Sequence, residues 1–303
     1  MSETLQPDPS MIGGVPTAPL AFLPDPVRVF QARKQRFAFL AESSELAPCL
    51  AFLADLSALQ ARLAVTLPPA SAPTEARRRA AAAGAMPPID RAALVDDAAL
   101  IATLDALCEG ATQIDMPEPA RLALDAVRGA DEADRAWLLG NILADDVPAD
   151  STAPHLFAAA AVQVHLARLA ALLDSDALVP VAVGTCPSCG GRPVTSSIKG
   201  TPGIENVRYA TCGCCATQWN EVRVKCLCCG STKGIAYRSA ETHEATVKAE
   251  TCGECKSWVK IFHESRNPSL DPVADDVASL GLDMLMKEAG YRHGGFNPFI
   301  MGY

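Results

Sequence analysis

Apolar residues recur at helical spacing through most of the first 178 residues of the chain. Asp25 followed by Pro26 is typical of a helix start, because aspartate caps free N–H groups and proline suits the first turn. The apolar stripes predict helices that begin at Asp25 and Pro48 and others over 96–109, 117–128, 131–143 and 151–173. We therefore expect an all-helical domain over residues 25–178, preceded by a flexible tail over residues 1–24. The Pro- and Ala-rich segment 66–88 predicts a linker with a short helix.

The pattern changes at Val179. From there to Asn267, Leu and Ala become rarer while β-branched residues, aromatic residues, Gly and Cys increase, which is typical of short strands and turns. Residues 206–211 and 245–251 alternate like the strands of hairpins. Asp271 and Pro272 then predict one last helix, ending near Glu288. The apolar face expected for it consists of Val273, Val277, Leu280 and Met284, and an extended aromatic tail follows from Tyr291.

Cysteine is the most informative residue type in this second half. The chain has 12 cysteines, and ten of them lie between Cys186 and Cys255. Eight form four Cys-x-x-Cys pairs, and each residue of the first two pairs recurs 40 positions later, so the segment contains an internal repeat. Gly190 and Gly230 are also 40 positions apart, so they occupy the same position in the two copies. The paired cysteines are Cys186, Cys189, Cys212, Cys215, Cys226, Cys229, Cys252 and Cys255.

Each repeat supplies four thiols as two tight turns, which is the ligand set of a tetrahedral zinc or iron ion. We therefore predict two metal ions, one in each repeat. The expected fold is α+β and multidomain: the helical domain, two tandem rubredoxin-like or zinc-ribbon modules at 179–222 and 223–268, and a C-terminal helix and tail at 269–303.

Other uses of these cysteines are weaker. A thioredoxin-type redox pair normally occurs once and precedes a helix, whereas four pairs stand here among strand and turn residues. A site joining Cys212 and Cys215 to Cys226 and Cys229 would break the regular repeat. The remaining four cysteines are expected outside the sites. Cys214 and Cys228 are predicted to be spare thiols within the turns, and Cys49 and Cys108 to be core residues of helices, like His155 and His165.

Charge argues against nucleic acid as a ligand. The chain carries a formal charge of −9, with a pI of about 5.1. Residues 186–267 contain 11 basic and 7 acidic residues, and this +4 falls to zero when eight thiolates bind two divalent ions. A neutral module on an acidic body has little affinity for phosphates.

Neither an enzyme nor a membrane protein is indicated. We find no catalytic pairing of nucleophile and base, no basic apolar leader, and no unbroken apolar stretch long enough for a membrane span, so we expect a cytoplasmic protein without stable membrane insertion. The sequence carries no indication of its oligomeric state.

The chain resembles the bacterial formate dehydrogenase accessory protein family. The matching features are the helical N-terminal region, Cys186-Pro187-Ser188-Cys189-Gly190 and the three later Cys-x-x-Cys motifs, Ala274-Asp275-Asp276-Val277-Ala278-Ser279-Leu280, and Asn297-Pro298-Phe299. The resemblance implies a cytoplasmic maturation factor that is not an enzyme, binds the catalytic subunit of respiratory formate dehydrogenase, and carries iron. Cys214 and Cys228 are extra to the family pattern.

The alternative is a rubredoxin-type electron carrier or redox partner. About 180 residues of helical domain argue against a plain carrier, because a carrier would not need them. Binding of the client is expected at the groove where the helical domain meets the modules.

Overall fold

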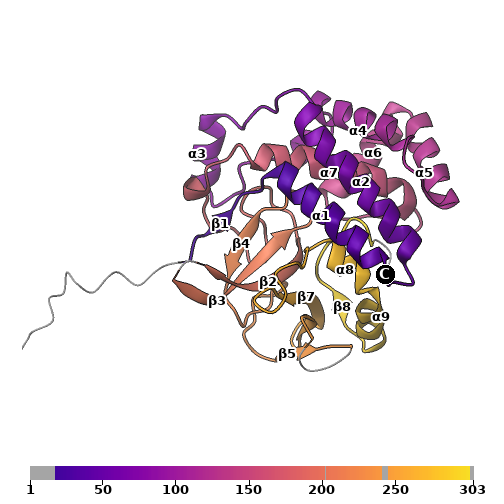
Figure 1. Cartoon of the computed structure of the whole chain (residues 1–303). Helices are drawn as coiled ribbons and strands as arrows, with labels where there is room; N and C mark the ends of the chain where they lie inside the picture. Colours follow the sequence, from indigo (N-terminus) through magenta and orange to yellow (C-terminus); the bar gives the residue numbers. More distant parts are fainter. Residues whose placement is uncertain (1–17, 202, 241–244, 301–303) are drawn as a thin grey trace, which may run out of the picture.

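The structure is a computed structural model that describes residues 18–201, 203–240 and 245–300. The described part of its first half contains seven α-helices. They are grouped on one side of the molecule in Figure 1. They are α1 (Pro26–Ala41), α2 (Ala47–Thr66), α3 (Glu75–Ala83), α4 (Ala98–Ala111), α5 (Glu118–Gly129), α6 (Glu132–Leu143) and α7 (Thr152–Ala170). Asp25 caps α1 by accepting a hydrogen bond from the N–H of Arg28. The short helix expected in the 66–88 linker is α3.

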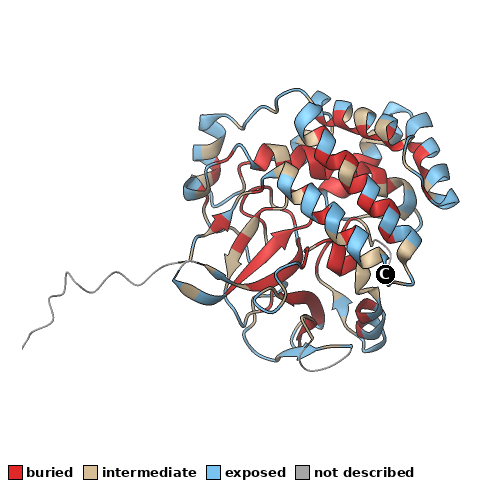
Figure 2. Cartoon of the chain, in the orientation of Figure 1, coloured by how far each residue is buried: buried red, intermediate tan, exposed pale blue. Residues whose placement is uncertain are grey.

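Helix α7 is the centre of the helical half. Figure 2 shows it buried along nearly its whole length, and it contacts α1, α2, α4, α5 and α6. His155 and His165 are both buried within it, as expected for core residues. By length and composition, α2 is the one described helix that could cross a membrane. Its leucines are instead buried against neighbouring helices, so α2 is a core helix here.

The eight described strands form one sheet, in the order β1-β4-β3-β2-β7-β6-β5, with β8 also paired to β7. They are β1 (Ala21–Phe22), β2 (Pro193–Thr201), β3 (Ile204–Cys212), β4 (Gln218–Glu221), β5 (Ile235–Arg238), β6 (Val247–Cys252), β7 (Ser257–His263) and β8 (Arg292–His293). Each repeat contributes three antiparallel strands. The repeats meet where β2 pairs in parallel with β7, so they are arranged head to tail.

The sheet also joins the repeats through a buried ion pair. Arg208 on β3 lies 2.7 Å from Glu250 on β6, and it donates to Ser196 Oγ and to the carbonyl of Lys225. The helical half shares one hydrophobic core with the first module, including Cys186, Val194 and Trp219. The predicted fold class is confirmed, with the two modules fused into a single sheet.

The C-terminal helix is interrupted, contrary to the expectation of one continuous helix. It forms α8 (Ala274–Ala278) and α9 (Leu280–Glu288), because the backbone of Ser279 leaves helical geometry, with φ −97° and ψ 29°. The break rotates the buried face: Leu282 and Met286 are buried, whereas Met284 is 56% exposed. Helix α8 packs on α1, where Arg36 makes an ion pair of 2.7 Å with Asp275.

Two smaller expectations were wrong. Part of the expected tail, Ala21–Phe22, is strand β1, which pairs with β4 and covers the edge of the sheet; residues 1–17 of that tail lie outside the described residues. Cys49 is exposed rather than in the core, because it lies on the outer side of the first turn of α2. Cys108 is buried in α4 as expected.

Candidate metal centres

The structure brings the four cysteines of each repeat together. In the first cluster, Cys186 and Cys189 come from the turn before β2, Cys212 ends β3, and Cys215 lies in the turn before β4. The corresponding residues around β5, β6 and β7 form the second cluster, Cys226, Cys229, Cys252 and Cys255. Within each cluster all four sulfur atoms lie within 4.8 Å of one another.

The sulfur spacing suits a metal ion. The Sγ atoms of Cys186 and Cys215, and those of Cys189 and Cys212, are 3.5 Å apart, and the corresponding distances in the second cluster are 3.7 Å. Four sulfurs about 2.3 Å from a central ion form a tetrahedron with edges of about 3.8 Å. A disulfide requires about 2.05 Å. Both clusters therefore have the donor set and the spacing of a tetrahedral zinc or iron centre.

The turns that present the thiols match between the repeats. The N–H groups of Gly190 and Gly230 donate to the carbonyls of Cys186 and Cys226, at 2.8 and 3.0 Å. Both glycines have positive φ, 78° and 76°, a conformation that most side chains disfavour. The second turn of each cluster contains a non-glycine residue with positive φ instead, Ala216 at 59° and Lys256 at 55°. Backbone geometry of this kind shapes a ligand site before an ion is bound.

Burial makes four thiolates costly without a cation. It raises the pKa of Cys186 and Cys215, and their neighbouring thiols add to the effect for Cys186. Cys255 differs: its pKa is lowered to about 7, because hydrogen bonds from Ser257 outweigh the opposing effect of burial. A bound divalent cation would supply the charge that lets all four sulfurs ionise.

A buried polar group beside the first cluster was missed by the sequence analysis. Arg91 makes two hydrogen bonds to Asp145, at 2.6 and 2.9 Å, and lies 3.5 Å from the sulfur of Cys214. Asp145 also accepts from the N–H of Arg192, at 2.8 Å. Cys214 lies outside the ligand set, as expected for a spare thiol, and it is buried with polar partners. Arg91 and Asp145 lie 54 positions apart in segments that have no motif, so the sequence offered no signal for the pair.

A third group of possible ligands is already occupied by a lysine. Asp276, Asp283 and His293 lie close together, but Lys260 Nζ is 2.9 Å from Asp276 and 2.5 Å from Asp283. Asn297 donates to the other oxygen of Asp276, at 2.7 Å. The lysine supplies the positive charge that the carboxylates need, so this group is an ion-pair network that attaches α8 and α9 to β7.

Comparisons with known proteins cover the whole described chain. The family models described as FdhE N-terminal, FdhE central domain and FdhE C-terminal domain match residues 18–183, 185–223 and 224–300. A protein FdhE homolog of Rhizobium meliloti is 54% identical over 301 residues, which cover 99% of this chain and 98% of that protein. Protein FdhE of Salmonella paratyphi B is 32% identical over 285 residues, covering 93% and 91% of the two chains.

A solved structure agrees with the fold. The crystal structure of the FdhE protein from Pseudomonas aeruginosa matches with a TM-score of 0.83 and 31% sequence identity, covering 93% of this chain and 99% of that one. The chain therefore belongs to the FdhE family, the formate dehydrogenase accessory proteins that its motifs resemble.

Proposed function

We propose that this protein acts in the cytoplasm by binding the catalytic subunit of a formate dehydrogenase and supporting its maturation, without catalysing a reaction itself. In this proposal each four-cysteine cluster holds one metal ion, iron or zinc. The observation that carries the proposal is the match of FdhE models from residue 18 to residue 300, because it includes both the helical half and the modules.

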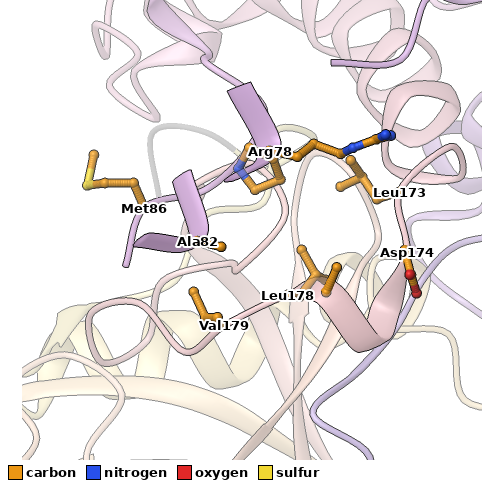
Figure 3. A pocket seen from close by; sticks show the side chains of 9 residues that line it. Arg78, Ala82, Met86, Leu173, Asp174, Leu178 and Val179 are labelled. Atoms are coloured by element: carbon orange, nitrogen blue, oxygen red, sulfur yellow. The ribbon is translucent and has the colours of Figure 1, made fainter. Parts of the chain in front are cut away.

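A small hollow in the helical half, next to Val179 where the first module begins, is the candidate contact with the client. Figure 3 shows it between α3, which contributes Arg78 and Ala82, and the segment that contains Leu173, Leu178 and Val179. Met86, which is 58% exposed, lies at its rim. The hollow is apolar, is flanked by Arg78 and Asp174, and is too small for a whole segment, so it suits contact with a single apolar side chain of the client.

The test is capture of the dehydrogenase subunit by the full-length protein, together with formate respiration in a strain that lacks the gene. We expect capture by the native protein, and loss of formate oxidation in the deletion strain while the dehydrogenase genes remain expressed. Normal formate respiration in that strain, or failure of the native protein to capture the subunit, would contradict the proposal. Elemental analysis should give two metal ions per chain.

Variants locate the contact. Met86→Glu should weaken capture, because it places a charge at the apolar rim. Leu122→Glu is the matched control, since Leu122 is 62% exposed on α5 and lies outside the hollow. Equal capture by both variants would place the contact elsewhere on the molecule.

A redox role is the second candidate, and the exposure of Cys229 favours it, because electron exchange requires access to the metal. A redox role predicts a reversible colour change of the iron-loaded protein at a defined potential. Tight capture of the subunit by a protein that shows no such change favours the first candidate.

A further inference from the structure

The internal repeat provides a direct comparison between two centres with the same ligands. The clusters have equal numbers of thiols, equal spacing along the chain, and the same turn hydrogen bonds at Gly190 and Gly230. Their sulfur distances differ by only 0.2 Å, 3.5 against 3.7 Å. Any difference in how the two centres exchange a metal must therefore come from their surroundings.

The surroundings of the first cluster are closed. Its four cysteines are 0–1% exposed. The helical half covers the turn: the N–H of Ile89 donates to the carbonyl of Ser188 at 3.1 Å, and Gln163 donates to the carbonyl of Gly213 at 2.8 Å. The Arg91–Asp145 pair lies against Cys214 on the same side. An incoming ligand reaches these sulfurs only after the helical half has moved away.

The second cluster is open by comparison. Cys226 and Cys252 are buried, but Cys229 is exposed and Cys255 is partly exposed. Leu227 and Val259 of this module belong to the large shared core. Its Trp258 packs instead with Leu282 and Met286 of α9 in a small separate cluster. A ligand from solvent can therefore approach one side of this centre while the module stays folded.

We propose that the two centres have different roles: the first is a locked structural centre, and the second is an exchange centre that accepts an incoming soft donor, such as a thiolate or a chelating nitrogen ligand. Cys229 would be the ligand that the incoming donor replaces, because its thiolate is the exposed one, and the released thiolate would take up a proton from a buffer acid in the solvent. No electron is transferred. The inference rests on metal binding by both clusters and not on the identity of the client.

The rate at which zinc passes from the full-length zinc-loaded protein to the chromophoric chelator 4-(2-pyridylazo)resorcinol tests this proposal. We expect two phases of equal amplitude, the second at least roughly tenfold slower, because it requires an opening of the shared core. Alkylation with iodoacetamide during the fast phase should label the second cluster, and labelling of Cys186 and Cys189 should follow with the slow phase. A single phase, or first labelling of Cys186, would overturn the inference. A zinc content other than two per chain would instead reject the premise that both clusters bind a metal ion.

A variant of the Arg91–Asp145 pair tests whether this pair keeps the first centre closed to solvent. Asp145→Asn keeps the shape of the side chain and tolerates the positive φ of 53° at this position, but it removes the charge that holds Arg91. Loss of this charged hydrogen-bond pair should accelerate the slow phase by roughly tenfold and leave the fast phase unchanged. Asp146→Asn is the matched control, because Asp146 is exposed beside it. An unchanged slow phase in Asp145→Asn would show that the pair does not contribute to the lock.

Discussion

At the scale of single residues, the two repeats differ most where the first one touches other parts of the chain. Gly213 and Gly253 occupy the same position in the two modules, next to Cys212 and Cys252. A Cβ at Gly213 would lie 2.2 Å from the carbonyl oxygen of Phe296, whereas at Gly253 its nearest neighbour would be 3.4 Å away. The glycine is therefore required by packing in the first repeat and not in the second.

Gly213→Ala should destabilise the protein by about 1–3 kcal/mol, the usual cost of forcing extra volume into a packed site. Gly253→Ala is the control and should leave stability close to that of the native protein. Denaturant unfolding of the metal-loaded proteins measures both. Equal losses in the two variants would contradict this packing argument.

His165 predicts a pH dependence. Burial lowers its pKa, the nearby Asp97 opposes this weakly, and neither ring nitrogen has a hydrogen-bond partner among the described residues. The unfolded chain, with a pKa of about 6.5, then binds more protons than the folded protein. Stability should therefore fall as pH decreases through about 6.5, until the lower folded pKa is reached.

The measurement compares the native protein with His165→Gln in denaturant unfolding between about pH 7.5 and 5.5, a range that spans the unfolded pKa of histidine. The native protein should lose more stability over this range than the variant. Effects of acid on the cysteines cancel in the difference. Parallel curves would show that His165 does not contribute.

At the scale of elements, the interrupted C-terminal helix depends on a lysine in the sheet. Lys260 on β7 is fully buried and joins Asp276 of α8 to Asp283 of α9, and it also donates to the carbonyl of Asp276 at 2.7 Å. Burial raises the pKa of Asp283 to about 6, although Lys260 opposes the increase. The helices are therefore attached to the sheet by charge as well as by the apolar contacts of Leu282 and Met286.

Lys260→Met should cost about 3–5 kcal/mol of stability, because it leaves two buried carboxylates without a cation. Adding Asp276→Asn and Asp283→Asn to this variant should restore part of the loss. Lys287→Met, at an exposed position of α9, is the control. The measurement is thermal unfolding of the native protein, Lys260→Met, the triple variant and Lys287→Met. A Lys260→Met protein as stable as the Lys287→Met control would contradict the role of the network.

At the scale of the whole molecule, the sequence predicts a division at Val179, between helices and modules, so that chelation would unfold everything after that residue first. The two modules differ in how many of their residues pack with the helical half. Val194, Ala210 and Trp219 of the first module belong to the same core as the helical half. The second module contributes Leu227 and Val259 to that core, while its Trp258 packs in a smaller cluster. The first module should therefore remain folded with the helices when the second loses its metal.

Hydrogen exchange during partial chelation tests this division. Removal of one metal equivalent should reduce the protection of residues 223–263 and leave residues 25–222 protected, because a small ribbon takes much of its folding energy from its ion. Removal of both should then unfold the first module together with part of the helical half. Simultaneous loss of protection in both modules at one equivalent would argue for the boundary at Val179.

The sequence was sufficient for features that depend on local spacing. Helix periodicity predicted α1, α2 and α4–α7, and the 40-residue repeat identified the cysteines that the fold brings together. Features that depend on distant partners could not be read in this way. The β2–β7 pairing joins residues more than 60 positions apart, and Arg91 meets Asp145 only after the helices have packed. The break at Ser279 is a change in the backbone angles of one residue, which a periodicity analysis does not register.

The head-to-tail order of the repeats has a consequence for how such a sheet can grow. Each module presents its first strand to the last strand of the next copy, as β2 does to β7, so the arrangement does not close on itself. One end is capped by β1, and at the other end β5 pairs only with β6 among the described strands. A third 40-residue copy inserted after His263 could dock on β5 by the same parallel pairing. Tandem duplication can therefore lengthen this sheet by whole modules, provided that the C-terminal segment still returns to pair as β8 beside Trp258.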